Sequence, residues 1–322
     1  MKKKYKLITG SAGFIGFHLC KFLLEKKINV IGVDNVNNYY SLKVKKKRLA
    51  ELKKYKNFIF KKIDISNKKK LNKIFNNYKI ESIINLAAQA GVSYSMKYPD
   101  KYFKSNMEGF YNICSFAKNK NINKIIYASS SSVYGDNKNL PVKENFNTKP
   151  LNYYAITKVN NEETAKFFSE ISNTNYVGLR FFSIYGPFGR PDMLIYKLLN
   201  RIKNKKKFYL NNYGKHTRDF TYIGDVVKII YKLLVNKNKK NNLIYNICNS
   251  KSVSLKKLLS LFKKNKLYPR IVNRGFQKGD IKDALGCNKK IKKHTKFKNF
   301  MSFEKGLNHT LDWYNSNSKI YE

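Results

Sequence analysis

The sequence predicts an α/β protein built on a doubly wound, mostly parallel sheet, with a smaller mixed α/β region toward the C-terminus. Three observations support this prediction. Short apolar runs alternate with longer helical stretches through the first half of the chain. A glycine-rich turn follows the first apolar run directly. After Arg180 the alternation breaks down into a mixture of short strand-like runs and helices.

Six apolar runs form the predicted sheet. The helical stretch after the first run ends at about Lys26, another begins at about Tyr39, and a third follows the third run. The segments between the runs are long enough for crossover helices, so we expect parallel strands with helices on both faces. The runs are KLIT (6–9), NVIGV (29–33), FIFKKID (58–64), SIINLAA (82–88), NKIIYASS (123–130) and YVGLRFF (176–182).

The second region begins after residue 180. From there to the C-terminus, helical stretches (193–203, 255–264) mix with strand-like runs (208–210, 218–223, 243–247). We therefore predict a first domain of residues 1–180 with later returns near 211–250, and a second region of residues 181–210 and 251–322. Ligands of open α/β sheets bind outside the carboxyl ends of the strands, so we expect a binding crevice between the two.

The net charge of +46 is the most conspicuous feature of the composition. The lysines occur in short clusters along the whole chain, and arginine is rare. A nucleic-acid-binding stripe would concentrate basic residues in one motif and use arginine prominently. The pattern therefore favours a solvated, lysine-rich surface without a nucleic-acid partner, although the charge can steer an anionic substrate.

Cysteine and histidine spacing indicates neither a disulfide framework nor a metal site. The four cysteines form no CxxC pair, which favours free thiols in a reducing compartment, and the four histidines share no ligand spacing. The basic and apolar N-terminus is interrupted early by glycine and serine, unlike a secretory signal, and no apolar run approaches the length of a membrane span. We expect a cytoplasmic protein with no membrane partner.

A phosphate-binding loop follows the first strand. Gly10, Gly13 and Gly16 have GxxGxxG spacing, and glycines there let the backbone approach a pyrophosphate at a helix N-terminus. Asp34 ends the second strand, where a carboxylate can bind the adenosine ribose and repel a 2′-phosphate, which favours NAD over NADP. The alternative for Asp34 is a solvated turn residue. Asp64 could reach the adenine amino group, or serve the start of the next helix near Ser66.

A proton-transfer group follows the fifth strand. Tyr154 and Lys158 are four residues apart and so share one face of a helix. A free tyrosine has a pKa near ~10, and a nearby cation favours the phenolate. Upstream, ASSSSVYG (128–135) supplies hydroxyls that could hold a substrate oxygen. The strength of this pattern lies in its order along the chain: glycine loop, acid, serine cluster and then YxxxK.

With these motifs, nearly the whole chain resembles the extended short-chain dehydrogenase/reductase family. The resemblance implies a Rossmann-type fold, bound NAD, and a catalytic group of Ser130, Tyr154 and Lys158. It also implies a homodimer formed through helices near 99–120 and 150–172. The implied cofactor contacts are Gly10, Gly13, Phe14, Ile15, Gly16, Asp34, Asp64, Ile65, Leu86, Ala87, Ala88, Asn106, Tyr154, Lys158 and Phe181.

Four longer runs resemble the UDP-glucuronate 4-epimerases within that family: NLAAQAGVSYS (85–95), SSSSVYG (129–135), FFSIYGPFGRPDM (181–193) and RDFTYIGD (218–225). The resemblance implies that Arg190 binds the sugar carboxylate with help from Ser183, and that Arg218 contacts the diphosphate. Ser131, Ser132, Gln277 and Asp280 match further positions near the nucleotide sugar. The chain departs from the family pattern at Ser93, where arginine is usual, and at residues 281–284.

The implied reaction inverts carbon 4 of UDP-glucuronate to give UDP-galacturonate, through a transient 4-keto sugar, for surface polysaccharide precursors. Ser131 and Ser132 stand where related dehydratases and decarboxylases carry acidic residues, and serine cannot replace a carboxyl acid/base. The main alternative is a 4-epimerase of neutral UDP-sugars such as UDP-glucose or UDP-N-acetylglucosamine. Arg190 would then pin its loop to a backbone carbonyl or an acid. A decarboxylase, or a non-catalytic protein that binds NAD or nucleic acid, is less favoured.

Overall fold

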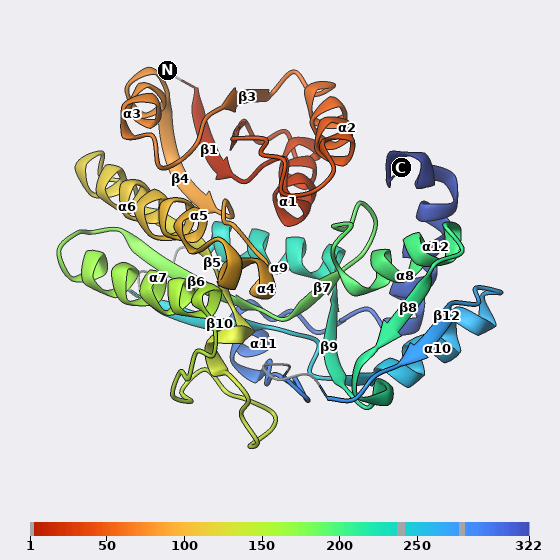
Figure 1. Ribbon diagram of the computed structural model, residues 1–322. Helices are drawn as coiled ribbons and strands as arrows, with labels where there is room; N and C mark the ends of the chain where they lie inside the picture. Colours follow the sequence, from red (N-terminus) through yellow and green to blue (C-terminus); the bar gives the residue numbers. More distant parts are fainter. Residues whose placement is uncertain (1–2, 237–241, 277–280, 322) are drawn as a thin grey trace.

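The computed structural model describes residues 3–236, 242–276 and 281–321 (Figure 1). Its main sheet has seven described strands in the order β10-β6-β5-β4-β1-β2-β3, and every neighbouring pair is parallel. All six predicted strands are confirmed, and a seventh joins the edge beside β6. The strands are β1 (Lys4–Thr9), β2 (Val30–Asp34), β3 (Phe58–Lys62), β4 (Lys79–Asn85), β5 (Lys124–Ser130), β6 (Asn175–Phe181) and β10 (Leu243–Ile247).

Helices cover both faces of this sheet, as predicted. One buried cluster joins the sheet to α1 (Phe14–Glu25), α2 (Leu42–Lys53), α9 (Ile223–Val235) and α11 (Lys289–Thr295). The other joins it to α3 (Lys68–Asn77), α6 (Gly109–Asn119) and α7 (Tyr153–Glu170). Neighbouring strand residues such as Ile83 and Ile84 belong to opposite clusters. Both faces of each central strand are therefore buried, which is why the runs are continuously apolar instead of alternating.

The strand order reverses at β1, which pairs with β2 on one side and β4 on the other. Successive crossovers therefore leave in opposite directions and open a crevice at the carboxyl ends. Two predicted strands are shorter there than expected. The run 58–64 ends as a strand at Lys62, and the run 82–88 ends at Asn85. The residues beyond these ends leave the sheet and line the crevice.

The second region surrounds its own core of aliphatic and aromatic side chains. Its sheet has the order β11-β9-β7, and β8 pairs with β12 in a separate parallel ribbon. The predicted helices at 193–203 and 255–264 and strands at 208–210 and 218–223 are present within a residue. The elements are β7 (Ser183–Tyr185), α8 (Leu194–Lys203), β8 (Lys207–Leu210), β9 (Thr217–Tyr222), β11 (Ser252–Ser254), α10 (Leu255–Lys264), β12 (Arg270–Asn273) and α12 (Phe303–Asn317).

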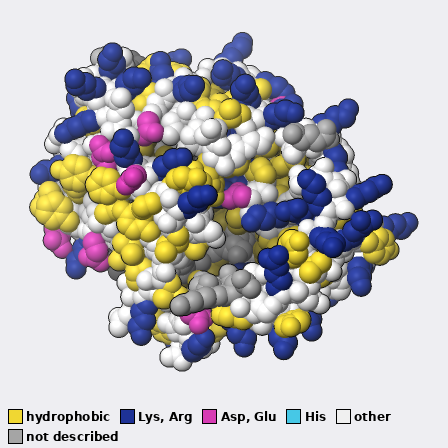
Figure 2. Space-filling model, in the orientation of Figure 1, with side chains coloured by type: hydrophobic (Ala, Val, Ile, Leu, Met, Phe, Trp, Pro, Cys, Tyr) yellow, Lys and Arg dark blue, Asp and Glu magenta, His cyan; other side chains and the backbone are white. Residues whose placement is uncertain are grey.

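Short helical segments complete the described chain: α4 (Val92–Lys97), α5 (Pro99–Tyr102), the π-helical η1 (Phe103–Glu108), and the 3-10 segments η2 (Ser131–Tyr134), η3 (Asn211–Gly214) and η4 (Ser318–Tyr321). The four cysteines are buried free thiols. No helix among the described residues is both long and apolar enough to cross a membrane. Lysine and arginine side chains are scattered across the face seen in Figure 2, as their distribution along the sequence predicts.

Candidate active site

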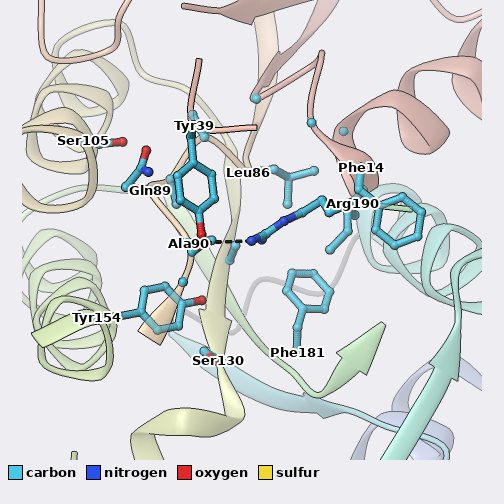
Figure 3. A pocket seen from close by; sticks show the side chains of 18 of the residues that line it. Phe14, Tyr39, Leu86, Gln89, Ala90, Ser105, Ser130, Tyr154, Phe181 and Arg190 are labelled. Atoms are coloured by element: carbon cyan, nitrogen blue, oxygen red, sulfur yellow. Dashed lines mark hydrogen bonds between the residues drawn. The ribbon is translucent and has the colours of Figure 1, made fainter. Parts of the chain in front are cut away.

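A cavity of about 810 Å³ opens at the carboxyl ends of the central strands. Its walls come from the glycine loop after β1, the segments after β2 and β4, the serine cluster after β5, the start of α7, and the segment from β6 to α8. Figure 3 shows Tyr154, Ser130, Phe181 and Arg190 around this space. The cavity therefore lies in the crevice that the strand order creates, and its volume is within the range of about 300–1,000 Å³ that is usual for small-molecule and cofactor sites.

The glycine loop is as tight as the sequence predicts. Gly10 has a φ of +70°, and a Cβ atom at Gly16 would lie 2.1 Å from the Gly10 carbonyl oxygen. Larger residues therefore cannot occupy these two positions without moving the loop. Helix α1 begins at Phe14 after Gly13, which has no side chain to cap it. The first-turn N–H groups thus suit an anion such as a pyrophosphate.

Asp34 is a buried acid at the end of β2, with 8% of its surface exposed. This burial contradicts the alternative of a solvated turn residue. Its Oδ2 accepts a hydrogen bond from the Ala12 N–H (3.0 Å), and its Oδ1 accepts one from the Val36 N–H (2.7 Å). Burial raises the pKa of this carboxyl, while the Lys45 ammonium lowers it. Asp34 therefore joins the glycine loop to the segment that follows β2.

Asp64 serves the start of the next helix and also lies at the cavity wall. It lines the cavity, and its Oδ1 accepts hydrogen bonds from the N–H and hydroxyl of Ser66 (3.0 and 2.8 Å) just before α3. The Asn35 amide donates to its Oδ2 (2.7 Å). These hydrogen bonds lower the pKa of Asp64 against the opposing effect of burial, so the carboxylate is held ionised at the cavity wall.

Asn106 is the one predicted cofactor residue that does not line the cavity. It is buried in η1, where its side chain binds the backbone N–H and carbonyl of Gln89 (2.8 and 3.1 Å) and the hydroxyl of Thr157 (3.0 Å). Asn106 therefore holds the cavity-lining segment that contains Gln89, and its contact with a cofactor stays a prediction. The other predicted cofactor residues all line the cavity.

The predicted catalytic side chains come together in the cavity. Tyr154 and Ser130 both line the cavity, and the Ser130 Oγ accepts a hydrogen bond from the Ser132 hydroxyl (2.7 Å). The Lys158 Nζ lies 5.8 Å from the centre of the Tyr154 ring and donates to the Ala128 carbonyl (2.8 Å). Strand β5 and helix α7 pack against each other, and this packing brings the serine cluster to the phenol.

The electrostatic prediction for Tyr154 needs a correction. Burial raises its pKa, and the groups that lower it are Ser130, by its hydrogen bond, and Arg190, by its charge. Lys158 was expected to favour the phenolate, and its ammonium persists at neutral pH although burial lowers its pKa to about 8. Its ammonium points to the Ala128 carbonyl instead of the phenol oxygen. Lys158 is thus not among the groups that lower the pKa of Tyr154, and a bound nicotinamide is the other cation expected to favour the phenolate.

A buried ion pair between Arg180 and Glu162 lies next to the predicted catalytic residues. The Arg180 Nε and Nη2 atoms donate to the two carboxylate oxygens of Glu162 (2.9 and 2.7 Å), and the Ser129 hydroxyl donates to the same carboxylate (2.5 Å). The side chains of Arg180 and Glu162 are 4% and 5% exposed. Because Glu162 lies one helical turn after Lys158, its charge raises the pKa of that lysine against the effect of burial.

Arg190 lines the cavity but already has partners. Its Nε and Nη2 atoms donate to the two oxygens of Asp192 (3.0 Å for Nε to Oδ1), and Nη2 also donates to the Ala90 carbonyl (2.7 Å). The guanidinium lies 5.7 Å from the centre of the Tyr39 ring. These contacts are the ones expected if Arg190 pins its loop to a carbonyl and an acid. Nη1 has no hydrogen-bond partner within the described residues, which leaves a donor for a ligand.

The loop that carries Arg190 is held through its backbone carbonyls, which accept hydrogen bonds from side chains of other elements. The carbonyl oxygens of residues 186 to 189 accept hydrogen bonds from Tyr196 (2.9 Å), His18 (2.8 Å), Arg48 (2.5 Å) and Tyr321 (2.8 Å), respectively. Arg48 is fully buried and also donates to the Ala12 carbonyl in the glycine loop (2.9 Å). The base of Arg190 is therefore set by side chains from α1, α2, α8 and the C-terminal η4.

The remaining predicted substrate residues divide into three groups. Ser131, Ser132 and Ser183 line the cavity, as does the departure residue Ser93. Arg218 does not line the cavity. Its Nη1 donates to the carbonyls of Thr217 (2.7 Å) and Lys282 (3.1 Å). Segment 281–284, which differs from the family pattern, therefore helps to hold this guanidinium. Gln277 and Asp280 lie outside the described residues.

Several cavity residues escape sequence reasoning. They include Tyr39, Lys45, Gln89, Ser105 and Asp192. Asp192 could have been suspected because it lies two residues from Arg190 in the same loop. The others are ordinary polar residues of helix or loop patterns, and only the packing of η1 and α2 against the strand ends brings them to the cavity.

Comparison with known proteins places the chain in a family. Residues 6–248 match the model of the NAD dependent epimerase/dehydratase family. The chain belongs to this family. Members of the NAD dependent epimerase/dehydratase family use the cofactor after which the family is named, and the glycine loop and Asp34 of this chain fit that cofactor.

Three relatives narrow the comparison. A UDP-glucuronate 4-epimerase of Thermodesulfobacterium geofontis is 34% identical over 98% of each chain. The structure of a UDP-glucuronic acid 4-epimerase from Bacillus cereus, in complex with UDP-glucuronic acid and NAD, has a TM-score of 0.89 at 28% identity and covers 97% of this chain and 99% of that one. A UDP-glucose 4-epimerase from Thermotoga maritima with UDP-glucose has a TM-score of 0.89 at 26% identity, with 98% and 99% covered.

Proposed function

We propose that this chain is an NAD-dependent epimerase that inverts carbon 4 of a UDP-uronic acid and interconverts UDP-glucuronate and UDP-galacturonate. The observation that carries the proposal is the position of the Arg190 guanidinium in the same cavity as Tyr154 and Ser130, near enough to lower the pKa of Tyr154. A cation there suits a sugar whose carbon 6 is a carboxylate. The similarity to the UDP-glucuronate 4-epimerases over nearly the whole chain supports this choice.

The residues of the chain can perform the proton transfers of this reaction. Tyr154, as phenolate, takes the proton of the sugar 4-hydroxyl, and the Ser130 hydroxyl holds the same oxygen. When bound, NAD supplies the hydride acceptor and donor at carbon 4. After the 4-keto sugar has turned in the pocket, Tyr154 returns its proton to the carbonyl oxygen from the same position. The substrate is therefore inverted at carbon 4 without net oxidation.

The 4-keto intermediate of a uronic acid can lose carbon dioxide, because it is a β-keto acid. In that side reaction the bond between carbons 5 and 6 breaks and its electron pair moves into the enolate of the ketone. This step needs the breaking bond to align with the carbonyl π system. We propose that Arg190, together with Ser183, holds the carboxylate out of that alignment.

The second candidate is a 4-epimerase of neutral UDP-sugars. It is favoured by the contacts of Arg190 with Asp192 and Ala90, which satisfy much of the guanidinium without any ligand. The similarity to a UDP-glucose 4-epimerase is also extensive. Both candidates use the same Tyr154 and Ser130 chemistry and differ only in what lies at carbon 6.

Product analysis separates the candidates. The purified protein is incubated with UDP-glucuronate, UDP-glucose and UDP-N-acetylglucosamine, and the products are resolved chromatographically. We expect turnover of UDP-glucuronate, and turnover of only the neutral sugars would overturn the proposal. The Arg190→Ala variant should lose its preference for UDP-glucuronate over UDP-glucose and release carbon dioxide. Unchanged selectivity without carbon dioxide would exclude a carboxylate role for Arg190.

We further propose that the chain forms a homodimer through the surface of α4 to α7. Met96, Phe103, Tyr111, Ile156 and Phe167 are each 45% to 68% exposed on these elements. Figure 2 shows a hydrophobic patch on the side where Figure 1 places α6 and α7. An apolar patch of this kind is typical of a protein interface. The expected partner is a second copy, because these helices can pair across a two-fold axis.

Sedimentation equilibrium tests the homodimer. We expect Phe167→Lys to shift the protein toward the monomer, since it places a charge in the apolar interface. Tyr268→Lys is the matched control, because Tyr268 is also an exposed aromatic residue (65%) but lies outside this patch. A wild-type protein that is monomeric at micromolar concentration would contradict the proposal.

A further inference from the structure

Asp192 is a second carboxylate at the guanidinium that is proposed to bind the substrate carboxylate. It lies two residues after Arg190, across Pro191, and receives hydrogen bonds from both Nε and Nη2. The Tyr39 hydroxyl donates to Asp192 Oδ2 (3.2 Å). Arg190, Asp192 and Tyr39 all line the cavity, and the side chains of Arg190 and Asp192 are only 19% and 30% exposed.

The hydrogen bonds of Arg190 leave no free pair of neighbouring nitrogens for a second carboxylate. A guanidinium has five N–H groups, one on Nε and two on each Nη atom. Nε donates to Asp192, and Nη2 donates to Asp192 and to Ala90. Only Nη1 is without a partner among the described residues. A substrate carboxylate can therefore accept from Nη1 alone. Two parallel hydrogen bonds, from Nη1 and Nη2, require Asp192 to lose its hydrogen bond from Nη2.

This competition matters because of the ring turn. For hydride to leave one face of carbon 4 and return to the other, the sugar must present opposite faces in succession, and its carbon 6 carboxylate must move with it. A guanidinium with no other acceptor would resist that movement, because release leaves a desolvated, uncompensated cation. Asp192 provides a replacement acceptor at the same guanidinium. The Tyr39 hydroxyl remains a donor to Asp192 while the guanidinium is bound to the substrate.

We propose that Asp192 is a positioning residue that exchanges with the substrate carboxylate for the Arg190 guanidinium, and so sets how firmly the uronic acid is held while its ring turns. The inference rests on the proposed epimerisation of a UDP-uronic acid. Asp192 is suited to the exchange because the charge and hydrogen bonds of Arg190 lower its pKa against the effect of burial. It thus remains a carboxylate whenever the guanidinium is near.

The test is Asp192→Asn, which keeps the size and one acceptor oxygen but removes the charge. With UDP-glucuronate we expect KM to fall about fivefold and kcat to fall about tenfold, since a charge-assisted hydrogen bond is roughly twice as strong as a neutral one. The inhibition constant of UDP-glucose as a competitor should stay within about twofold, because a neutral sugar does not draw on this charge. Asp192→Ser should shift KM and kcat in the same directions if the asparagine variant folds poorly.

The arms of the experiment distinguish the possible failures. A higher KM for UDP-glucuronate, an unchanged kcat, or an equal change in the inhibition constant of UDP-glucose would overturn the exchange and leave Asp192 a structural residue of its loop. In the Arg190→Ala background, Asp192→Asn should have no further effect on the ratio of UDP-glucuronate to UDP-glucose affinity. A persistent effect in that background would also overturn the exchange. The wild-type product analysis separately decides the proposed function.

Discussion

Replacing Glu162 by glutamine tests the role of the buried ion pair beneath the catalytic group. The carboxylate accepts from two nitrogens of Arg180 and from the hydroxyl of Ser129, with all three distances between 2.5 and 2.9 Å. The glutamine keeps the shape but offers one oxygen where the carboxylate has two. It also leaves the guanidinium buried without a counter-charge, because the remaining described acceptor of Arg180 is the Glu144 carbonyl at 3.2 Å.

The expected loss follows from this geometry. Breaking a buried ion pair by removing one partner costs about 3–5 kcal/mol. That is a large share of a typical stability of about 5–15 kcal/mol. The double variant Glu162→Leu, Arg180→Met removes both charges, a replacement that is often neutral or stabilising when the new side chains pack well, and the neutral groups left without partners cost about 1–3 kcal/mol each. We therefore expect the double variant to be more stable than Glu162→Gln alone.

Urea unfolding at a fixed protein concentration measures both variants, because association would otherwise add to the apparent stability. A second measurement follows the titration of the Lys158 ammonium by NMR. Glu162 raises the pKa of Lys158, which burial lowers to about 8. The Lys158 ammonium is lost as pH rises through its pKa, so in Glu162→Gln this titration should occur at lower pH. A glutamine variant within 1 kcal/mol of wild type, or a double variant no more stable than the single one, would refute this account.

Three further outcomes follow from the site and its supports. Tyr154→Phe should lower kcat by about 10²–10⁴-fold while NAD binding, measured by titration calorimetry, persists; substantial turnover would exclude the phenol as the proton-transfer group. Gly16→Ala should abolish NAD binding in the same assay without unfolding the chain, because the added Cβ meets the Gly10 carbonyl at 2.1 Å. Asp219 is buried and its pKa is raised by burial to about 7. Its protonation therefore stabilises the fold fully below the unfolded value of 3.8, and this stability is lost as pH rises through about 7. Asp219→Asn should flatten that pH dependence in urea unfolding between pH 4 and 8, and a slope equal to wild type would show that another group titrates.

Much of the fold could be predicted because its determinants are local. Strands buried on both faces need continuous apolar runs, and the six runs of the first half locate their strands within a few residues. The seventh strand, β10, was recognised as a strand-like run at 243–247. Its place beside β6 was not, because an apolar run does not specify its neighbour. Pairing depends on the crossover through α9, whose apolar face packs on α1.

The site was predictable where a motif carries its own geometry. The glycine spacing and the YxxxK pair each lie within one turn or one helix, so their positions in the cavity follow from the strand order. Asn106, Arg218 and Arg190 show the limit. Their residue types suggest ligand contacts, but hydrogen bonds to Gln89, Lys282 and Ala90, respectively, hold part or all of each side chain.

The amino-acid sequence by itself determined the doubly wound sheet, the dinucleotide loop, and the presence of a tyrosine, a lysine and a serine for proton transfer. Only the tertiary structure decided how the charged groups share their partners. Arg190 meets a carbonyl 100 residues away, and its partner Asp192 meets a tyrosine 153 residues away. Such contacts arise when separate crossovers bring loops to one end of the sheet. No local pattern encodes them, because each loop is compatible with many neighbours until the strands between them have paired.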